Sequence, residues 1–380
     1  MENWQFVQSL ILDNTEESLT LEEFLEEWNN SSDTVLVHTS GSTGKPKPMH
    51  VEKRRMEASA RMTCDFLGLH EGDTALLCLP LDFIAGKRMV VRALTRGLRL
   101  IEVEPSGHPL RESTQKGRFL LCNSSQSTQR EPSLLCTFAA MVPLQVWNSL
   151  QVPEERERLM QIKQLIIGGG AIDEALEREL KDFPNAVWST YGMTETLSHI
   201  ALRRLNGPER SEWYTPFDGV SLSLSEDGCL VIDAPAVHDG PLVTNDIVEF
   251  EENEECWSLK KDPKRVRRFR ILGRKDNVIC SGGIKIQIEE VERTLQPHLA
   301  VPFLITCAKD ERLGEQVVLL IEQGEVDEVE AICHRTLPKY WQPRHILSID
   351  HLPMTPTGKP ARSEARKLVE QLIAEHKRNK

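Results

Sequence analysis

The chain has 380 residues, enough for two or three domains, and its 39% hydrophobic and 27% charged residues are typical of a globular protein. A formal net charge of −12 argues against a nonspecific nucleic-acid binder, which needs a basic surface. The sequence shows no signal-peptide pattern, no apolar run long enough to cross a membrane and no metal-ligand spacing among its nine cysteines, so we expect a cytoplasmic protein with reduced thiols.

The first half of the chain predicts strands that alternate with helices. An amphipathic helix is expected over residues 15–29 and a short strand over 35–37, and residues 50–67 have a helical pattern. Further strands are expected over residues 75–79, 99–103, 134–138 and 164–167, and helical stretches separate most of them. This alternation favours an α/β fold with a largely parallel sheet.

The pattern changes twice in the second half. From about residue 213, short strands and turns indicate a small antiparallel, barrel-like part. From about residue 275, a helix near 286–295, strands near 302–307 and 316–321 and a terminal helix indicate a small α+β domain. We therefore expect two domains, residues 1–273 and 274–380.

Residues 38–47 read HTSGSTGKPK and follow a predicted strand. Glycines, hydroxyl groups and lysines in that position can hold phosphate, although a mobile surface loop has the same composition. The segment is not a Walker A loop, because Pro46 follows Gly44-Lys45 where Ser or Thr is required. Its role depends on the rest of the chain.

Four later segments give this loop a context: IGGGA at 167–171, YGMTET at 191–196, LGRKDNVICSGG at 272–283 and PMTPTGKPAR at 353–362. The ordered set resembles the adenylate-forming superfamily of acyl- and aryl-CoA synthetases, luciferases and adenylation domains. Residues 79–94 and 191–203 are most similar to the o-succinylbenzoate–CoA ligases of menaquinone synthesis. The resemblance implies that a carboxylate reacts with ATP to give an acyl-adenylate, from which CoA then displaces AMP, and that Mg²⁺ assists.

The resemblance also implies roles for individual residues. Lys359, Thr194 and Glu195 are expected to act in catalysis, with Glu195 also holding Mg²⁺. ATP or AMP is expected to contact Thr39, Ser40, Gly41, Ser42, Thr43, Gly44, Lys47, Gly169, Gly170, Ala171, Tyr191, Gly192, Met193, Asp246 and Arg274. Asp276 matches the hinge of a mobile C-terminal domain, and Gly282 and Gly283 match the CoA path. Lys87, Ser198 and His199 match the acid pocket, where one of them is expected to meet a second carboxylate.

Three features depart from the family pattern. Pro48 and Asn245 stand where the family usually has glycine, and the phosphate loop begins at residue 38, so most of one N-terminal subdomain is missing or reduced. A second subunit in a homo-oligomer is one way to cover the surface this exposes. The expected partners are a small carboxylic acid, ATP and CoA, with no nucleic acid and no membrane insertion. Another acyl-CoA ligase, a carrier-loading adenylation domain and a non-catalytic adenylate-binding regulator are the alternatives.

Overall fold

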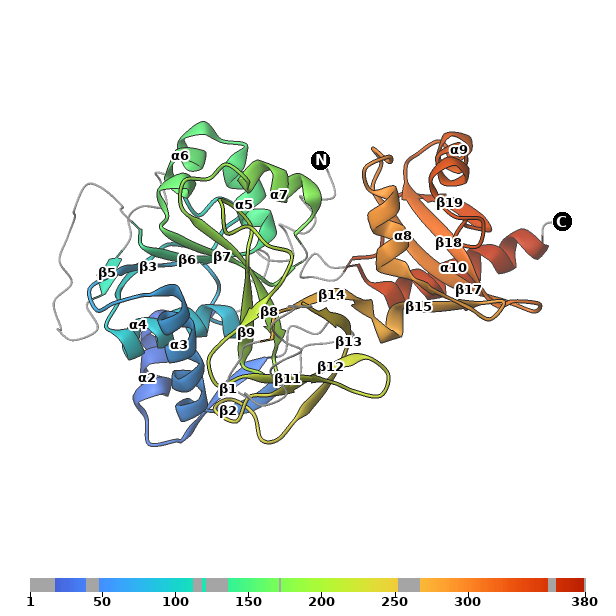
Figure 1. Ribbon diagram of the computed structural model, residues 1–380. Helices are drawn as coiled ribbons and strands as arrows, with labels where there is room; N and C mark the ends of the chain where they lie inside the picture. Colours follow the sequence, from blue (N-terminus) through green and yellow to red (C-terminus); the bar gives the residue numbers. More distant parts are fainter. Residues whose placement is uncertain are drawn as a thin grey trace.

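The computed structural model describes residues 18–38, 48–111, 118–120, 136–170, 172–251, 267–354 and 360–378. Its largest element is an eight-stranded sheet with the order β10-β9-β8-β7-β6-β3-β4-β5 (Figure 1). The strands are β3 (Thr74–Leu77), β4 (Arg99–Glu102), β5 (Arg118–Leu120), β6 (Phe138–Met141), β7 (Gln164–Ile167), β8 (Ala186–Met193), β9 (Ser198–Arg204) and β10 (Thr215–Pro216).

The centre of this sheet is parallel, and its edges are antiparallel. Helices α3 (Lys53–Leu67) and α4 (Ile84–Arg96) lie on one face, and α5 (Pro143–Leu150), α6 (Pro153–Gln161) and α7 (Glu174–Leu180) lie on the other (Figure 1). Strand β6 is buried at all four positions, as expected for a strand covered on both faces. The α/β fold class expected from the sequence is confirmed.

A short hairpin precedes the sheet. Strands β1 (Thr34–His38) and β2 (Pro48–Glu52) pair antiparallel, from Thr34 opposite Glu52 to His38 opposite Pro48. Helix α2 (Leu21–Asn29) lies before them and begins with a capping box, in which Thr20 and Glu23 bond each other's backbone N–H. The expected phosphate loop, residues 39–47, connects the two strands and lies outside the described residues.

A second, antiparallel sheet follows in the order β11-β12-β13-β14, formed by β11 (Ser221–Leu224), β12 (Cys229–Asp233), β13 (Leu242–Phe250) and β14 (Phe269–Arg274). This agrees with the change of pattern near residue 213. Strand β14 then leads by the short 3-10 helix η3 (Lys275–Asn277) into the C-terminal part.

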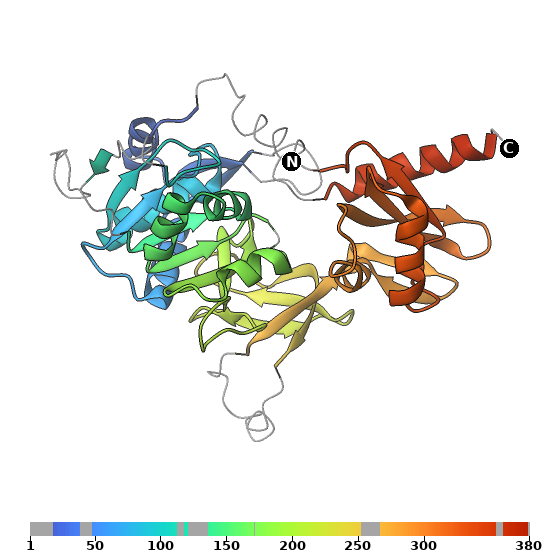
Figure 2. The same ribbon diagram turned by 90° about the horizontal axis from the view of Figure 1, so that it is seen from above.

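The C-terminal part has its own sheet and helices and forms a separate lobe in both views (Figures 1 and 2). Its strands are β15 (Val278–Ser281), β16 (Ile284–Gln287), β17 (Phe303–Asp310), β18 (Gly314–Glu322) and β19 (His345–Ile349), and its helices are α8 (Ile288–Leu295), α9 (Val326–Thr336) and α10 (Arg362–Arg378). One core of buried hydrophobic residues ends at Phe269, and the next begins at Ile279. The division into domains at residue 273 stays a prediction.

Two expectations about elements need correction. Residues 50–52 were expected to be helical, but they form part of β2, because pairing with β1 buries Val51. The hairpin of β8 and β9 was not anticipated; it pairs Trp188 with Arg204 and Tyr191 with Ala201. Among the described helices, none is long and apolar enough to cross a membrane.

Candidate active site

Several of the expected site residues lie at one edge of the large sheet. Strand β3 pairs with β4 on one side and with β6 on the other, so the chain reverses its direction of winding between β3 and β6. Ligands of open α/β sheets bind beyond the carboxyl ends of the strands near such a point. Gly169 and Gly170 follow the carboxyl end of β7, and Thr194 and Glu195 follow that of β8.

Glycine is required where these segments approach their neighbours. A Cβ atom at Gly168 would lie 2.4 Å from the hydroxyl of Thr190 on β8, and Gly169 has a φ of 80°. A Cβ atom at Gly192 would lie 2.1 Å from the carbonyl oxygen of Ser198. Gly168 therefore packs against a side chain of β8 and Gly192 against the backbone of β9, both closer than a residue with a Cβ atom permits.

The residues expected to bind adenosine are joined in one hydrogen-bonded network. The hydroxyl of Tyr191 donates to Asp246 Oδ2 at 2.6 Å, and Arg274 Nη1 donates to Asp246 Oδ1 at 3.1 Å. Arg274 also bonds both carboxylate oxygens of Asp276, at 3.0 and 3.1 Å. Burial, with the Asp246 carboxylate beside it, raises the pKa of Tyr191, so its hydroxyl keeps its proton and remains a donor. The network links the expected ribose acceptor to the expected hinge residue.

The ring of Tyr191 is 8% exposed and packs edge-on against Phe269, with 5.0 Å between ring centroids. Met193 is half-buried, and its N–H donates to the hydroxyl of Thr196. The stacking of adenine on Tyr191 remains a prediction, and Phe269 is the residue that holds the ring in its orientation.

Glu195 presents an exposed carboxylate next to the half-buried Thr194. Within the described ranges, no group of three His, Cys, Asp or Glu side chains is arranged to hold a metal. Mg²⁺ binds through one or two carboxylates together with water and substrate phosphates, and the exposed carboxylate of Glu195 is a ligand of that kind. That Glu195 holds Mg²⁺ remains a prediction.

Lys87 has a different environment from the one expected of an acid-binding residue. Its side chain is buried, its Nζ donates to the carbonyl oxygen of Leu36 on β1 at 2.7 Å, and it lies 3.5 Å from Glu27 Oε2. Glu27 Oε1 accepts the N–H of the same Leu36 at 2.9 Å. Lys87 and Glu27 thus satisfy both backbone groups of one β1 residue, as a neighbouring strand would.

We predict that Lys87→Met destabilises the protein by about 1–3 kcal/mol, because it leaves the Leu36 carbonyl and the Glu27 carboxylate without this partner. The exposed Lys163 provides the control, and Lys163→Met is expected to leave stability unchanged. Urea unfolding measures the difference. A Lys87→Met protein of unchanged stability but with more than tenfold weaker binding of the acid would instead support a role in the acid pocket.

His199 and Ser198 also have protein partners. His199 is 5% exposed, its Nε2 lies 3.1 Å from the hydroxyl of Thr63, and its Nδ1 lies 3.1 Å from the hydroxyl of Ser198. Burial, followed by the nearby Arg92 and Arg88 cations, lowers the pKa of His199 well below its usual value. The imidazole is therefore neutral at pH 7, so it can contribute a hydrogen bond to an acid but not a charge.

Two cations that the sequence analysis did not single out lie beside His199. Arg88 and Arg92 on α4 are 0% and 2% exposed. Arg88 Nε and Nη2 and Arg92 Nε have no hydrogen-bond partner, and no carboxylate of the described residues pairs with either guanidinium. Burial lowers the pKa of Arg92 to about 10, so it remains charged at pH 7. Two arginines four residues apart, on the same face of a helix that is apolar from Met89 to Val91, were the available signal in the sequence.

The C-terminal lobe supplies the remaining expected residues. Gly282 and Gly283 form the two-residue turn between β15 and β16, with φ values of 58° and 84° that favour a Gly-Gly pair. Both are exposed. Their part in a CoA path remains a prediction.

Some of the expected site residues lie outside the described residues: Thr39, Ser40, Gly41, Ser42, Thr43, Gly44, Lys47, Ala171 and Lys359. The chain on either side of residues 355–359 is well anchored. Met354 pairs with Pro360, and Arg362 bonds both oxygens of Glu292 on α8 at 3.0 and 2.8 Å.

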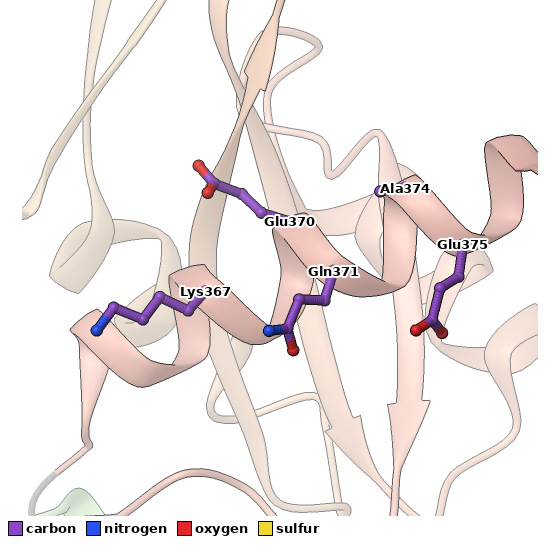
Figure 3. A pocket seen from close by; sticks show the side chains of 5 residues that line it. All are labelled: Lys367, Glu370, Gln371, Ala374 and Glu375. Carbon is purple, nitrogen blue, oxygen red and sulfur yellow. The ribbon is translucent and has the colours of Figure 1, made fainter.

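The outer face of α10 carries a shallow depression lined by Lys367, Glu370, Gln371, Ala374 and Glu375 (Figure 3). None of these residues belongs to the expected site. Its polar, open lining gives no reason to assign it a ligand.

The chain is similar to a family of known proteins. The family model described as AMP-binding enzyme matches residues 3–227, more than half of the chain. The 2-succinylbenzoate–CoA ligases of Bacillus cereus (strain ATCC 10987 / NRS 248) and Bacillus mycoides (strain KBAB4) are each 25% identical over 365 residues, which covers 91% of this chain and 72% of theirs.

Solved structures give the same result. An acyl-CoA synthetase (AMP-forming)/AMP-acid ligase II-like protein from Dyadobacter fermentans is 30% identical, with a TM-score of 0.57 over 92% of this chain and 96% of that one. The o-succinylbenzoate CoA synthetase of Bacillus subtilis, in complex with its acyl-adenylate intermediate, shares the fold at 23% identity, with a TM-score of 0.66 over 87% of this chain and 68% of that one. The chain therefore belongs to the AMP-binding enzyme family, in which these relatives are named as acyl-CoA synthetases and acid–CoA ligases.

Proposed function

We propose that the protein is an AMP-forming acid–CoA ligase whose acid carries a second anionic group, with o-succinylbenzoate as the first candidate. The observation that carries this proposal is the pair of buried guanidinium groups beside His199, Arg88 and Arg92, with which no carboxylate in the described part of the chain pairs. A buried charge without a partner is costly, so such a pair favours the binding of an anion. The named ligases to which the chain is similar act on an acid with two carboxylates.

The proposed reaction has two steps. A carboxylate oxygen of the acid attacks the α-phosphorus of ATP, the bond to the pyrophosphate oxygen breaks, and an acyl-adenylate forms. The sulfur of CoA then attacks the acyl carbon, its proton is lost to solvent, and AMP leaves with the electron pair of the broken C–O bond. Mg²⁺, when bound, would neutralise phosphate charge.

Different residues of this chain would bind the adenosine, the α-phosphate and the acid. Tyr191, Asp246 and Arg274 would hold the adenosine, since each oxygen of Asp246 retains acceptor capacity for a ribose hydroxyl. Thr194 would donate a hydrogen bond to the α-phosphate, and Lys359 would stabilise the charge that develops during attack. The acid would lie between this turn and the arginines of α4.

The experiment is a measurement of pyrophosphate and AMP release with Mg-ATP, with and without CoA. The acids are o-succinylbenzoate, benzoate, a fatty acid and none. Turnover with o-succinylbenzoate that depends on CoA is expected. Turnover with another acid alone would support a ligase but rule out o-succinylbenzoate as its substrate. Dependence on a carrier protein in place of CoA would indicate an adenylation domain. ATP binding without pyrophosphate release would indicate a regulator.

We predict that Arg92→Met raises the KM for the preferred acid by about 10- to 100-fold, because a hydrogen bond to a charged group contributes about 1.5–3 kcal/mol. The KM for ATP is expected to stay within about twofold. Steady-state kinetics with each substrate varied in turn measures both. An equal rise in both KM values would show that Arg92 supports the fold of the site and does not contact the acid.

A further inference from the structure

Arg88 connects α4 to the turn that follows β8. Its Nη1 donates to the carbonyl oxygen of Leu197 at 3.3 Å. Leu197 has a φ of 61°, in the left-handed region that a non-glycine residue rarely adopts. Such a conformation persists only where the surroundings hold it, and it is common where a segment serves a functional site. Arg88, which lies on α4, therefore helps to hold Leu197 in this conformation.

The turn held in this way carries Thr194 and Glu195. The N–H of Leu197 donates to the carbonyl oxygen of Thr194 at 2.8 Å. The buried hydroxyl of Thr196 accepts the N–H of Met193 at 3.1 Å and lies 2.7 Å from the carbonyl oxygen of Ser198. These bonds close the turn into one unit, so a displacement of Leu197 is passed to the two side chains expected at the phosphate and the metal.

The other side of the Arg88 guanidinium is buried and has no hydrogen-bond partner among the described residues. Its unpartnered nitrogens, Nε and Nη2, lie on one edge of the planar group, opposite the Nη1 that bonds Leu197. That edge matches the two oxygens of a carboxylate in a bidentate pair. Arg88 can therefore bond a carboxylate and Leu197 at the same time.

We propose that Arg88 is a positioning residue that couples the second carboxylate of the acid to the Thr194–Leu197 turn. This inference rests on the proposed function. A carboxylate on the Nε–Nη2 edge fixes the guanidinium, the guanidinium fixes Leu197, and the turn then holds Thr194 and Glu195 for reaction. The second carboxylate thus increases the rate of adenylation as well as affinity, which is how binding energy at a non-reacting group accelerates a reaction.

The test compares two acids on two proteins. The acids are o-succinylbenzoate and 4-oxo-4-phenylbutanoate, which lacks the ring carboxylate, and the proteins are the wild type and Arg88→Met. The rate of acyl-adenylate formation is measured in single turnover at saturating acid and Mg-ATP. We expect Arg88→Met to lower this rate about 10- to 100-fold with o-succinylbenzoate and less than about twofold with the analogue, which already reacts slowly with the wild type.

Arg88→Lys serves as the second variant. It keeps the cation but not the planar edge, so it is expected to bind o-succinylbenzoate better than Arg88→Met without recovering the rate. Arg88→Met removes a buried cation that no described carboxylate pairs, which is stabilising, and also the bond to Leu197, which costs about 1 kcal/mol, so the melting temperature of the ligand-free protein should change little. An unchanged melting temperature separates the effect from loss of folding. If Arg88→Met raises the KM for o-succinylbenzoate but leaves the single-turnover rate unchanged, the proposed coupling is wrong. If Arg88→Met lowers the rate equally with both acids, Arg88 has only a structural role.

The melting temperature with each acid, without ATP, separates this inference from the proposed function. A stabilisation by o-succinylbenzoate that is present in the wild type and lost in Arg88→Met supports the carboxylate contact, even if the acid is not the true substrate. If the wild type turns over o-succinylbenzoate and Arg88→Met does so equally well, the inference fails while the proposed function stands. If neither stabilisation nor turnover is seen with the wild type, both fail.

Discussion

Replacing Lys359 by alanine is expected to slow acyl-adenylate formation by about 10²- to 10³-fold, the loss typical of removing one group that stabilises charge developing in a transition state. The acid carboxylate and the α-phosphate are both anionic, and a cation that reaches both lowers the cost of bringing them together. Lys359 itself lies outside the described residues, and its role rests on the resemblance of its motif.

The same variant is expected to transfer the acyl group from a supplied acyl-adenylate to CoA within about twofold of the wild-type rate. The phosphate bond is already broken at that stage, so the charge that Lys359 stabilises no longer develops. The two half-reactions are measured separately, by pyrophosphate release and by thioester formation. Lys367→Ala, on the exposed face of α10, is the matched control. Equal loss in both half-reactions would show that Lys359 supports the lobe and does not act in one step.

Gly192→Ala is expected to destabilise the protein by about 3 kcal/mol and to abolish pyrophosphate release. Its Cβ atom would lie 2.1 Å from the carbonyl oxygen of Ser198 and 2.4 Å from the Cα atom of His199. Both contacts are with backbone, which cannot rotate away as a flexible side chain can. The β8–β9 hairpin would have to open at the point where the Thr194 turn begins.

Gly170→Ala is the comparison variant for stability. Its Cβ atom would meet only the ring of Pro143, at 3.3 Å, so a small shift suffices and less than about 1 kcal/mol is expected. The midpoint of urea unfolding measures both variants, with the slope checked for constancy. A Gly192→Ala protein as stable as Gly170→Ala would mean that the two strands separate at little cost, and the tight packing would then have no role.

Local sequence patterns were sufficient for much of the fold. Strand β7 coincides with the expected strand over residues 164–167, and the change to antiparallel strands after residue 213 is present. Both signals are short-range: an apolar run of strand length in one case and closely spaced turns in the other. The β2 strand was misjudged because residues 50–52 have no strong preference of their own and follow their pairing with β1.

Some residues of the candidate site were indicated by the sequence, and others were found only in the structure. Motif order alone indicated Tyr191, Asp246, Arg274 and Asp276, and the structure joins these four by hydrogen bonds. The same motifs offered Lys87 as an acid-binding cation. In the structure its ammonium group bonds Leu36 and lies near Glu27, whereas no carboxylate among the described residues pairs with Arg88 or Arg92, whose Nε atoms have no hydrogen-bond partner there.

The sequence by itself therefore determined the family and the α/β fold class and gave a prediction of the nucleotide-site residues, because motifs and periodicity are properties of neighbouring residues along the chain. Only the tertiary structure decided which cation of α4 is free to meet an acid. Lys87, Arg88 and Arg92 lie on one helix and are all basic, and what separates them is whether an element distant in the chain supplies a carboxylate: Glu27 lies 3.5 Å from Lys87, and none of the described residues supplies one to the two arginines. Burial and pairing arise from folding, so they had to be read from the folded molecule.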